Sequence, residues 1–305
     1  MHLFSRRRML IGMAGTAGMV ATSFAAEQPD TEALRATYRQ WIDSLPAAPA
    51  PELAKDRLTA TEIGRWHVLE ANQGVAVDAE HFYGIGNHAL VKHRKDTGKR
   101  VAEWFGPRGG SIIHINSGWV DGDDLVLSHS NFSQLPMASS LEIYDKKTLQ
   151  PKSSYSFGIR LGSLTWAVRH DGYWWACFAN YNDDGTTPGF DQRWTFLAQF
   201  DDNWQQLQSW VFPPQVVATW ADSSCSGGDW GDDGLLYVTG HDDPQLHVLR
   251  LPKQGVTLEY VTTIEVPFEG QSWAWDRSQE RVIYGISRAR QEVIAARIPA
   301  VPVTP

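Results

Sequence analysis

The sequence predicts an all-β protein, a five-bladed β-propeller. A Gly, Ser or Gln followed by a short alternating apolar segment recurs five times, and each recurrence is followed by a turn and further short apolar runs. Successive repeats start 44, 45, 64 and 44 residues apart, at Gly74, Gly118, Ser163, Gly227 and Gln271. A period near 45 residues with about four short strands per unit is typical of propeller blades. A β-sandwich with as many strands would not repeat its sequence at a fixed period.

The first 25 residues are typical of a cleaved export signal. Three arginines at 6–8 precede an apolar, Gly/Ala-rich stretch and the small-residue site at 23–25. The Ser-Arg-Arg-x-apolar-Leu pattern indicates a twin-arginine signal, whose machinery exports folded proteins. A Sec signal with an Arg-rich start is the alternative. Both interpretations predict a periplasmic or secreted protein, with no membrane insertion after cleavage.

Residues 26–55 are expected to form a short helix and a Pro/Ala linker. Asp30 is a plausible helix cap, and the Pro/Ala stretch at 46–51 ends the helical pattern. Five apolar side chains share one helical face: Leu34, Tyr38, Trp41, Ile42 and Leu45. The propeller would then occupy 56–305.

Two features of the repeats predict how the ring closes and where it is elaborated. The fifth repeat ends after three strands, at 298–299, while a spare strand at 65–70 precedes the first repeat. An N-terminal strand that completes the last blade would remove an exposed sheet edge. The 64-residue interval contains an insertion at 182–189, which either shapes the loop locally or covers one mouth of the channel.

Composition excludes some partners. The formal net charge is −8, and the signal contributes three arginines and no acid, so the mature chain has no basic surface typical of nucleic-acid binding. Fourteen tryptophans, about three times average usage, are expected to fill the wedges between blades. Cys177 and Cys225 could form one disulfide, although the apolar run around Cys177 favours a buried thiol.

Chain direction predicts which loops share a mouth of the channel. In a four-stranded antiparallel blade, residues that precede the first strand and residues that follow the second strand lie at the same end. This set is rich in His, Asn, Gln and Ser and poor in carboxylates, which disfavours a glycosidase with paired acids. The candidate site residues are Gln73, His114, Asn116, His129, Asn131, Asn180, Tyr181, His241, Gln271 and Arg288.

Two chemistries suit these candidates. His114, His129 and His241 could converge on a divalent metal such as Zn²⁺, or act as general base and acid without one. Tyr181 could donate a proton, Arg288 could bind a carboxylate, and the Asn and Gln side chains could position substrate. In the alternative interpretation the histidines are ordinary hydrogen-bonded residues and the amides cap loop backbone.

Four stretches carry a resemblance to a known family. His129-Ser130-Asn131, residues 137–145, Ser226-Gly227-Gly228-Asp229-Trp230 and Thr239-Gly240-His241-Asp242 resemble small secreted bacterial propellers loosely related to lactonase and NHL-type propellers, often labelled cycloisomerase-like. Lactonase-type propellers hold a divalent cation with Glu, Asn and Asp; here Glu70 alone stands near such a position. Gln73-Gly74-Val75 and Asp96-Thr97-Gly98-Lys99 are similar to five-bladed glutaminyl cyclases.

The resemblance and the residues together imply an exported enzyme. Its reaction would be elimination, isomerisation, or lactone ring opening or closing on a small polar or sugar-derived substrate. The competing hypothesis is a non-catalytic propeller that binds a glycan or a protein, since fold alone does not define function.

Overall fold

The computed structural model describes residues 31–46, 51–159, 162–182 and 187–302. The predicted signal, the proposed cap Asp30 and part of the insertion, at 183–186, lie outside these residues. The chain divides into two compact units, residues 1–50 and 51–305, which are described separately. In the first unit, α1 (Thr31–Ser44) covers the predicted helix, with acidic Glu32 in its first turn. No helix in the described ranges is long and apolar enough to cross a membrane.

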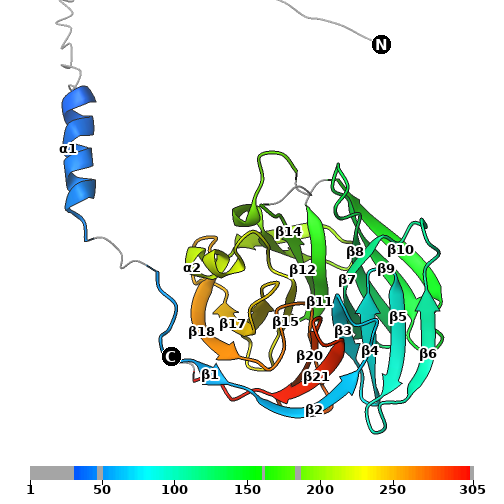
Figure 1. Ribbon diagram of the computed structural model, residues 1–305. Coiled ribbons are helices and arrows are strands. Elements are labelled where there is room, and N and C mark those ends of the chain that lie inside the picture. The colour runs from blue at the N-terminus through cyan, green and yellow to red at the C-terminus, as the bar shows by residue number, and fades with distance from the viewer. Residues whose placement is uncertain (1–30, 47–50, 160–161, 183–186, 303–305) are drawn as a thin grey trace, which may run out of the picture. The chain divides into compact units, whose positions relative to one another are not determined.

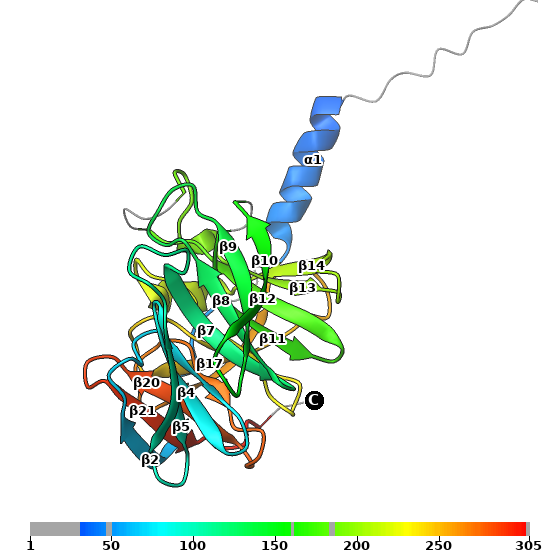
Figure 2. The same ribbon diagram turned by 90° about the vertical axis from the view of Figure 1, so that its right-hand side faces the viewer.

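The second unit is a five-bladed β-propeller (Figures 1 and 2), as predicted. Blade 1 contains β3 (Gly74–Val77), β4 (His81–Gly86), β5 (Ala89–Arg94) and β6 (Arg100–Phe105). Blade 2 contains β7 (His114–Asp121), β8 (Asp124–Ser130), β9 (Ser139–Asp145) and β10 (Pro151–Gly158). Blade 3 contains β11 (Ser163–His170), β12 (Tyr173–Ala179), β13 (Phe196–Phe200) and β14 (Gln206–Val211).

The last two blades include strands from the N-terminal side of the propeller. Blade 4 contains β15 (Gly227–Trp230), β16 (Leu236–Thr239), β17 (Gln245–Arg250) and β18 (Glu259–Glu265), and blade 5 contains β19 (Ala274–Trp275), β20 (Val282–Ser287) and β21 (Glu292–Arg297). β2 (Thr61–His67) pairs antiparallel with β21 as its outer strand. β1 (Leu58–Thr59), which the sequence analysis did not predict, pairs parallel with β18. Each innermost strand contacts the innermost strand of the next blade, in the order β3, β7, β11, β15 and β19. The last of them, β19, also contacts β3.

The innermost strand of blade 5 is short. The fifth repeat starts at Gln271, but β19 is confined to Ala274–Trp275. The preceding backbone bonds to other blades: the Gln271 carbonyl accepts from Thr239 Oγ1 at 2.6 Å, and Ser272 N donates to the Gln73 carbonyl at 3.3 Å. These contacts tie blade 5 to blades 4 and 1 at the predicted site.

Aromatic side chains fill the spaces between blades. Trp166 of β11 packs on Gly228 of β15, where a Cβ atom would stand 2.4 Å from the indole ring. A cluster around Trp166 joins blades 3 and 4 and includes Trp175, Trp210 and Trp230. Cys177 and Cys225 are both buried and unpaired in this structure. The Trp excess therefore serves packing here, as expected from the sequence.

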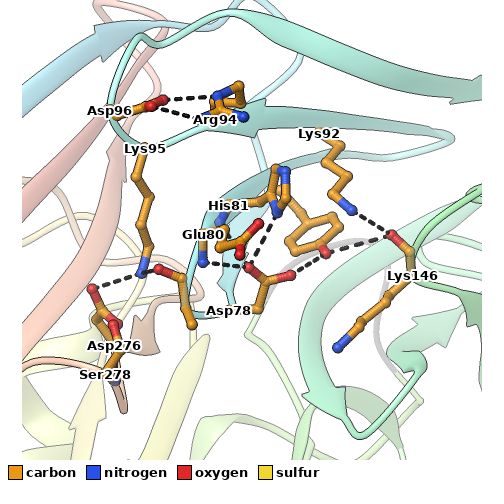
Figure 3. A network of polar contacts seen from close by, with 12 residues as sticks. Asp78, Glu80, His81, Lys92, Arg94, Lys95, Asp96, Lys146, Asp276 and Ser278 are labelled. Atoms are coloured by element: carbon orange, nitrogen blue, oxygen red, sulfur yellow. Dashed lines mark hydrogen bonds and ion pairs between the residues drawn. The ribbon is translucent and has the colours of Figure 1, made fainter.

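Opposite the candidate site, the turn residues form polar contacts between blades (Figure 3). Asp78, in the turn after β3, accepts from Tyr83 Oη at 2.6 Å, and the Lys92 ammonium donates to the Lys146 carbonyl of blade 2 at 3.1 Å. Lys95 of blade 1 pairs with buried Asp276 of blade 5 at 2.7 Å. Asp276 therefore links blade 5 to blade 1, whereas Asp78 orders the turn within blade 1 by accepting from Glu80 N, His81 N and Tyr83.

Candidate functional site

A cavity of about 220 Å³ lies at the mouth predicted to carry the site, and we call it the mouth cavity. Every blade contributes to it, through residues next to the start of a first strand or the end of a second strand. The described lining residues are Gln73, His114, Asn116, Phe132, Tyr181, Ser223, Ser226, His241, Gln271 and Arg288. Seven of the ten predicted site residues are therefore brought together. His129, Asn131 and Asn180 do not line the cavity.

His241 is held between an acid and a cation. It follows β16, and its Nδ1 lies 2.7 Å from Asp242 Oδ1, while its Nε2 lies 3.0 Å from Nη1 of Arg288, which follows β20. A guanidinium can only donate, so Nε2 must be the acceptor and Nδ1 must carry the proton shared with Asp242. The imidazole is thus neutral, with its lone pair directed at Arg288.

His114, at the start of β7, is the second histidine of the mouth cavity. Burial, assisted by the nearby His129, lowers its pKa to about 4, and a hydrogen bond with Asn116 opposes this shift. Its ring centroid lies 5.3 Å from that of Phe132. His114 therefore remains neutral at physiological pH, as either a donor or an acceptor of a hydrogen bond.

The amide side chains around these histidines are held by the protein itself. Asn116 Nδ2 donates to the Leu164 carbonyl at 2.8 Å and to Ser130 Oγ at 3.2 Å, which ties blade 2 to blade 3. Gln271 Nε2 donates to the His241 carbonyl at 3.2 Å, across the boundary of blades 4 and 5. Tyr181 is buried, with its ring centroid 5.0 Å from that of Phe132. The cavity wall is consequently pre-organised.

The structure corrects the predicted convergence of His114 and His129. In the β7–β8 register, His114 pairs with Ser130 whereas His129 pairs with Ile115. Adjacent positions on a strand face opposite sides of the sheet, so the two side chains leave opposite faces of the strand pair although they lie near each other. His129 is buried, accepts from Ile113 N at its Nε2 and contacts Ser140 Oγ through its Nδ1.

The three-histidine metal set is therefore not assembled. Both nitrogens of His129 are engaged elsewhere, and the lone pair of His241 faces a guanidinium cation rather than a shared centre. Across residues 31–46, 51–159, 162–182 and 187–302, no group of three His, Cys, Asp or Glu side chains is arranged to hold a metal ion. In this arrangement His114, His129 and His241 share no centre that could hold Zn²⁺.

Two predicted substrate-binding amides brace loops instead. Asn131 donates from Nδ2 to the Pro136 carbonyl at 2.9 Å and accepts from Ala138 N at 2.7 Å, which closes the loop between β8 and β9. Asn180 Nδ2 donates to the Trp194 carbonyl at 3.2 Å. Both match the interpretation that amides at this mouth cap loop backbone.

Phe132 and Ser223 line the cavity but were not among the predicted site residues. Phe132 directly follows Asn131, and an apolar residue in a polar loop could have been noticed as a candidate ring contact. Ser223 lies in the long connection between β14 and β15, which passes through α2 (Pro214–Val217) and the short helix Ala218–Trp220. No local sequence pattern predicts the path of that connection.

The geometry defines a five-bladed propeller with a small polar cavity on its channel mouth. No protein-family model matches the chain, and no curated protein matches it significantly. The structure of a glutaminyl cyclase from Myxococcus xanthus is similar, with a TM-score of 0.54 and 11% identity over 81% of this chain and 99% of that one. A protein of unknown function from Bacteroides caccae gives a TM-score of 0.41 at 12% identity, over 69% of this chain and 68% of that one. At these identities the likeness concerns the fold.

Proposed function

We propose that the protein is an enzyme that moves a proton on a small polar or sugar-derived substrate bound in the mouth cavity. The supporting observation is His241 in the cavity wall, whose Nδ1 is protonated towards Asp242 and whose basic Nε2 accepts from Arg288, another residue of the cavity lining. Isomerisation, elimination, and lactone ring opening or closing can all proceed with a general base of this kind. The similar M. xanthus enzyme is named for a cyclisation, which agrees with ring chemistry on this fold.

The residues divide the chemistry between them. His241 Nε2 accepts the proton, and the carboxylate of Asp242 stabilises the imidazolium that forms. Neutral His114 donates its one N–H to Asn116, so its other ring nitrogen can accept a hydrogen bond from a substrate hydroxyl. Gln73 and Gln271 fix the orientation of the substrate, whereas both Nδ2 protons of Asn116 are donated to Leu164 and Ser130.

The testing experiment is a product-detecting screen of lactones, hydroxy acids and sugar acids with purified mature protein. For any substrate converted, Asp242→Asn and His241→Gln are expected to lower kcat/KM by about 10²-fold or more. Asp243→Asn is the matched control, because it removes the neighbouring carboxylate, which does not contact His241. Equal rates in Asp242→Asn and Asp243→Asn would contradict the assignment. Recovery of a bound, unconverted glycan or peptide would favour the binding-protein alternative.

We also propose export through the twin-arginine machinery to the periplasm or the medium, supported by the arginines at 6–8 ahead of the apolar stretch. Replacement of Arg6 and Arg7 by Lys is expected to retain the precursor in the cytoplasm. Normal processing of this variant, measured by cell fractionation, would favour the Sec route.

A further inference from the structure

Arg288 is an unpaired cation in a cavity without carboxylates. The described residues that line the mouth cavity include no Asp or Glu. In the described part of the chain, no carboxylate forms an ion pair with Arg288, and its guanidinium contacts the neutral ring of His241 at 3.0 Å. The nearby Arg290, in contrast, pairs with Glu292 at 2.9 Å. The mouth cavity therefore favours an anionic group next to Arg288.

The main chain around Arg288 is fixed although its side chain is exposed. Arg288 N donates to Glu269 Oε2 at 2.6 Å, and Ser287 Oγ donates to Glu269 Oε1 at 2.9 Å. The Glu269 carboxylate is thus used on the end of β20 rather than on the guanidinium. Gly270, the next residue, packs so closely on blade 4 that a Cβ would lie 2.7 Å from the Gly240 carbonyl. This packing brings Arg288 of blade 5 to His241 of blade 4.

The contact with Arg288 occupies the atom that the proposed chemistry needs. The Nε2 lone pair of His241 accepts the guanidinium hydrogen bond, so it is not available to a substrate while Arg288 remains in place. A guanidinium binds a carboxylate through two parallel charge-assisted hydrogen bonds, which are stronger than one bond to a neutral imidazole. A carboxylate in the cavity would therefore draw Arg288 away from Nε2.

We infer that Arg288 determines specificity by coupling recognition of a carboxylate to exposure of the His241 base. The inference rests on the proposed function and names its substrate class: small molecules that carry a carboxylate beside the reacting centre, such as hydroxy acids or the lactones of dicarboxylic acids. A neutral analogue of the same shape leaves Arg288 on Nε2 and leaves the base covered.

The test observes His241 directly and requires no turnover. Full-length mature protein is labelled with ¹⁵N-histidine, and the Nε2 resonance of His241 is assigned from its loss in His241→Gln. Sodium acetate and acetamide serve as probes of equal shape and different charge, at about pH 8, well above the ordinary imidazole pKa. Acetate is expected to move the resonance saturably towards that of an uncovered lone pair, and acetamide is expected to leave it in place.

Two variants separate coupling from general charge effects. Arg288→Gln is expected to show the uncovered resonance without acetate and to lose the acetate response. Arg288→Lys keeps the positive charge but lacks the paired N–H donors of a guanidinium, so it is expected to bind acetate about tenfold more weakly. Arg290→Gln, with the same change of net charge, is expected to respond like wild type. Circular dichroism checks that each variant is folded.

The inference is overturned if acetate leaves wild type unchanged, if acetamide acts like acetate, or if Arg288→Gln still responds. Its failure is distinguishable from failure of the proposed function. If a neutral substrate is turned over in an Asp242-dependent reaction and acetate does not move the His241 resonance, the inference is wrong and the proposed enzyme function stands. The expected acetate response, with turnover indifferent to Asp242→Asn, retains the carboxylate site and removes the proposed base.

Discussion

The backbone N–H of Ile113 donates to Nε2 of His129 at 3.0 Å. Ser140 Oγ donates its proton to Glu142 at 2.6 Å. In the hydrogen bond of 3.0 Å between His129 Nδ1 and Ser140 Oγ, the imidazole must therefore be the donor. A continuous chain of hydrogen bonds thus runs from Ile113 through His129 and Ser140 to Glu142. Ile113 directly precedes His114, so His129 fixes the start of the strand that carries a histidine of the mouth cavity.

Replacement of His129 by Ala is expected to lower the free energy of unfolding by about 2 kcal/mol or more, because it leaves the Ile113 N–H and Ser140 without their partner and opens a space in the protein. Urea denaturation measures the change. His67→Ala is the control, since His67 is exposed on β2. If His129→Ala is as stable as His67→Ala, the chain of hydrogen bonds does not hold this strand in place.

The Lys95–Asp276 pair predicts a strong link between blades 1 and 5. Asp276 is buried, and it also accepts from Ser278 Oγ at 2.6 Å and from Gln279 Nε2 at 2.9 Å. Lys95→Met leaves this buried carboxylate without its cation, so a loss of about 3 kcal/mol in unfolding free energy is expected. The Arg94–Asp96 pair, also in Figure 3, is exposed and screened by solvent, so Arg94→Met should lower the unfolding free energy much less. Equal losses in both variants would contradict this ranking.

Two buried histidines predict acid lability. His247 is 1% exposed and lies between Thr219 and Thr263, and burial lowers its pKa to about 4, as it does for His114. These folded-state pKa values lie below the unfolded value of about 6.5. At pH values between about 4 and 6.5 the unfolded chain therefore binds more protons than the folded chain. Stability should be intact above pH 6.5 and decline as the pH falls to about 4, by roughly 3 kcal/mol for His247.

Urea denaturation across this pH range tests that decline. His247→Asn removes the titrating group, so this variant should lose less unfolding free energy than wild type between the two pH values. Parallel pH profiles of wild type and variant would show that His247 does not remain neutral in the folded state.

The blades and the mouth cavity could be predicted because both follow from local pattern and chain direction. The Asp-Gly turns at 121–122, 171–172 and 233–234 connect the first and second strands of blades 2, 3 and 4, and their glycines adopt positive φ values of 58°, 80° and 73°. Strand order alone then placed Gln73, His241 and Arg288, from blades 1, 4 and 5, at one mouth. Neither inference required knowledge of side-chain contacts.

Contacts that depend on register or on non-local pairing could not be predicted. In β7 the register shifts between Ile115 and Ser117, so Asn116 is an extra residue there, and a one-residue shift reverses the faces of the strand. The sequence places His114 and His129 at neighbouring strand ends but does not say which faces they share. The pairing of β1 with β18 joins residues about two hundred positions apart and has no local pattern.

The buried carboxylate of Asp229, on β15, is expected to oppose folding at neutral pH. It is 2% exposed, and burial raises its pKa to about 6, although Arg277 lies 3.2 Å away and opposes the shift. This folded-state pKa lies above the unfolded value of about 3.9. The contribution of protonated Asp229 to the unfolding free energy is therefore fully present below about pH 4 and is lost as the pH rises through 6. The loss at pH 7 is roughly 3 kcal/mol.

Asp229→Asn is therefore expected to be more stable than wild type at pH 7 and to lose this advantage near pH 4. Arg277 is not left unpaired in the variant, because it also binds Asp232 at 2.8 Å and the Trp230 carbonyl at 2.7 Å. Urea denaturation at the two pH values measures the difference, with Asp232→Asn, an exposed carboxylate on the same arginine, as control. A variant less stable than wild type at pH 7 would mean that the ion pair with Arg277 outweighs the burial of the charge.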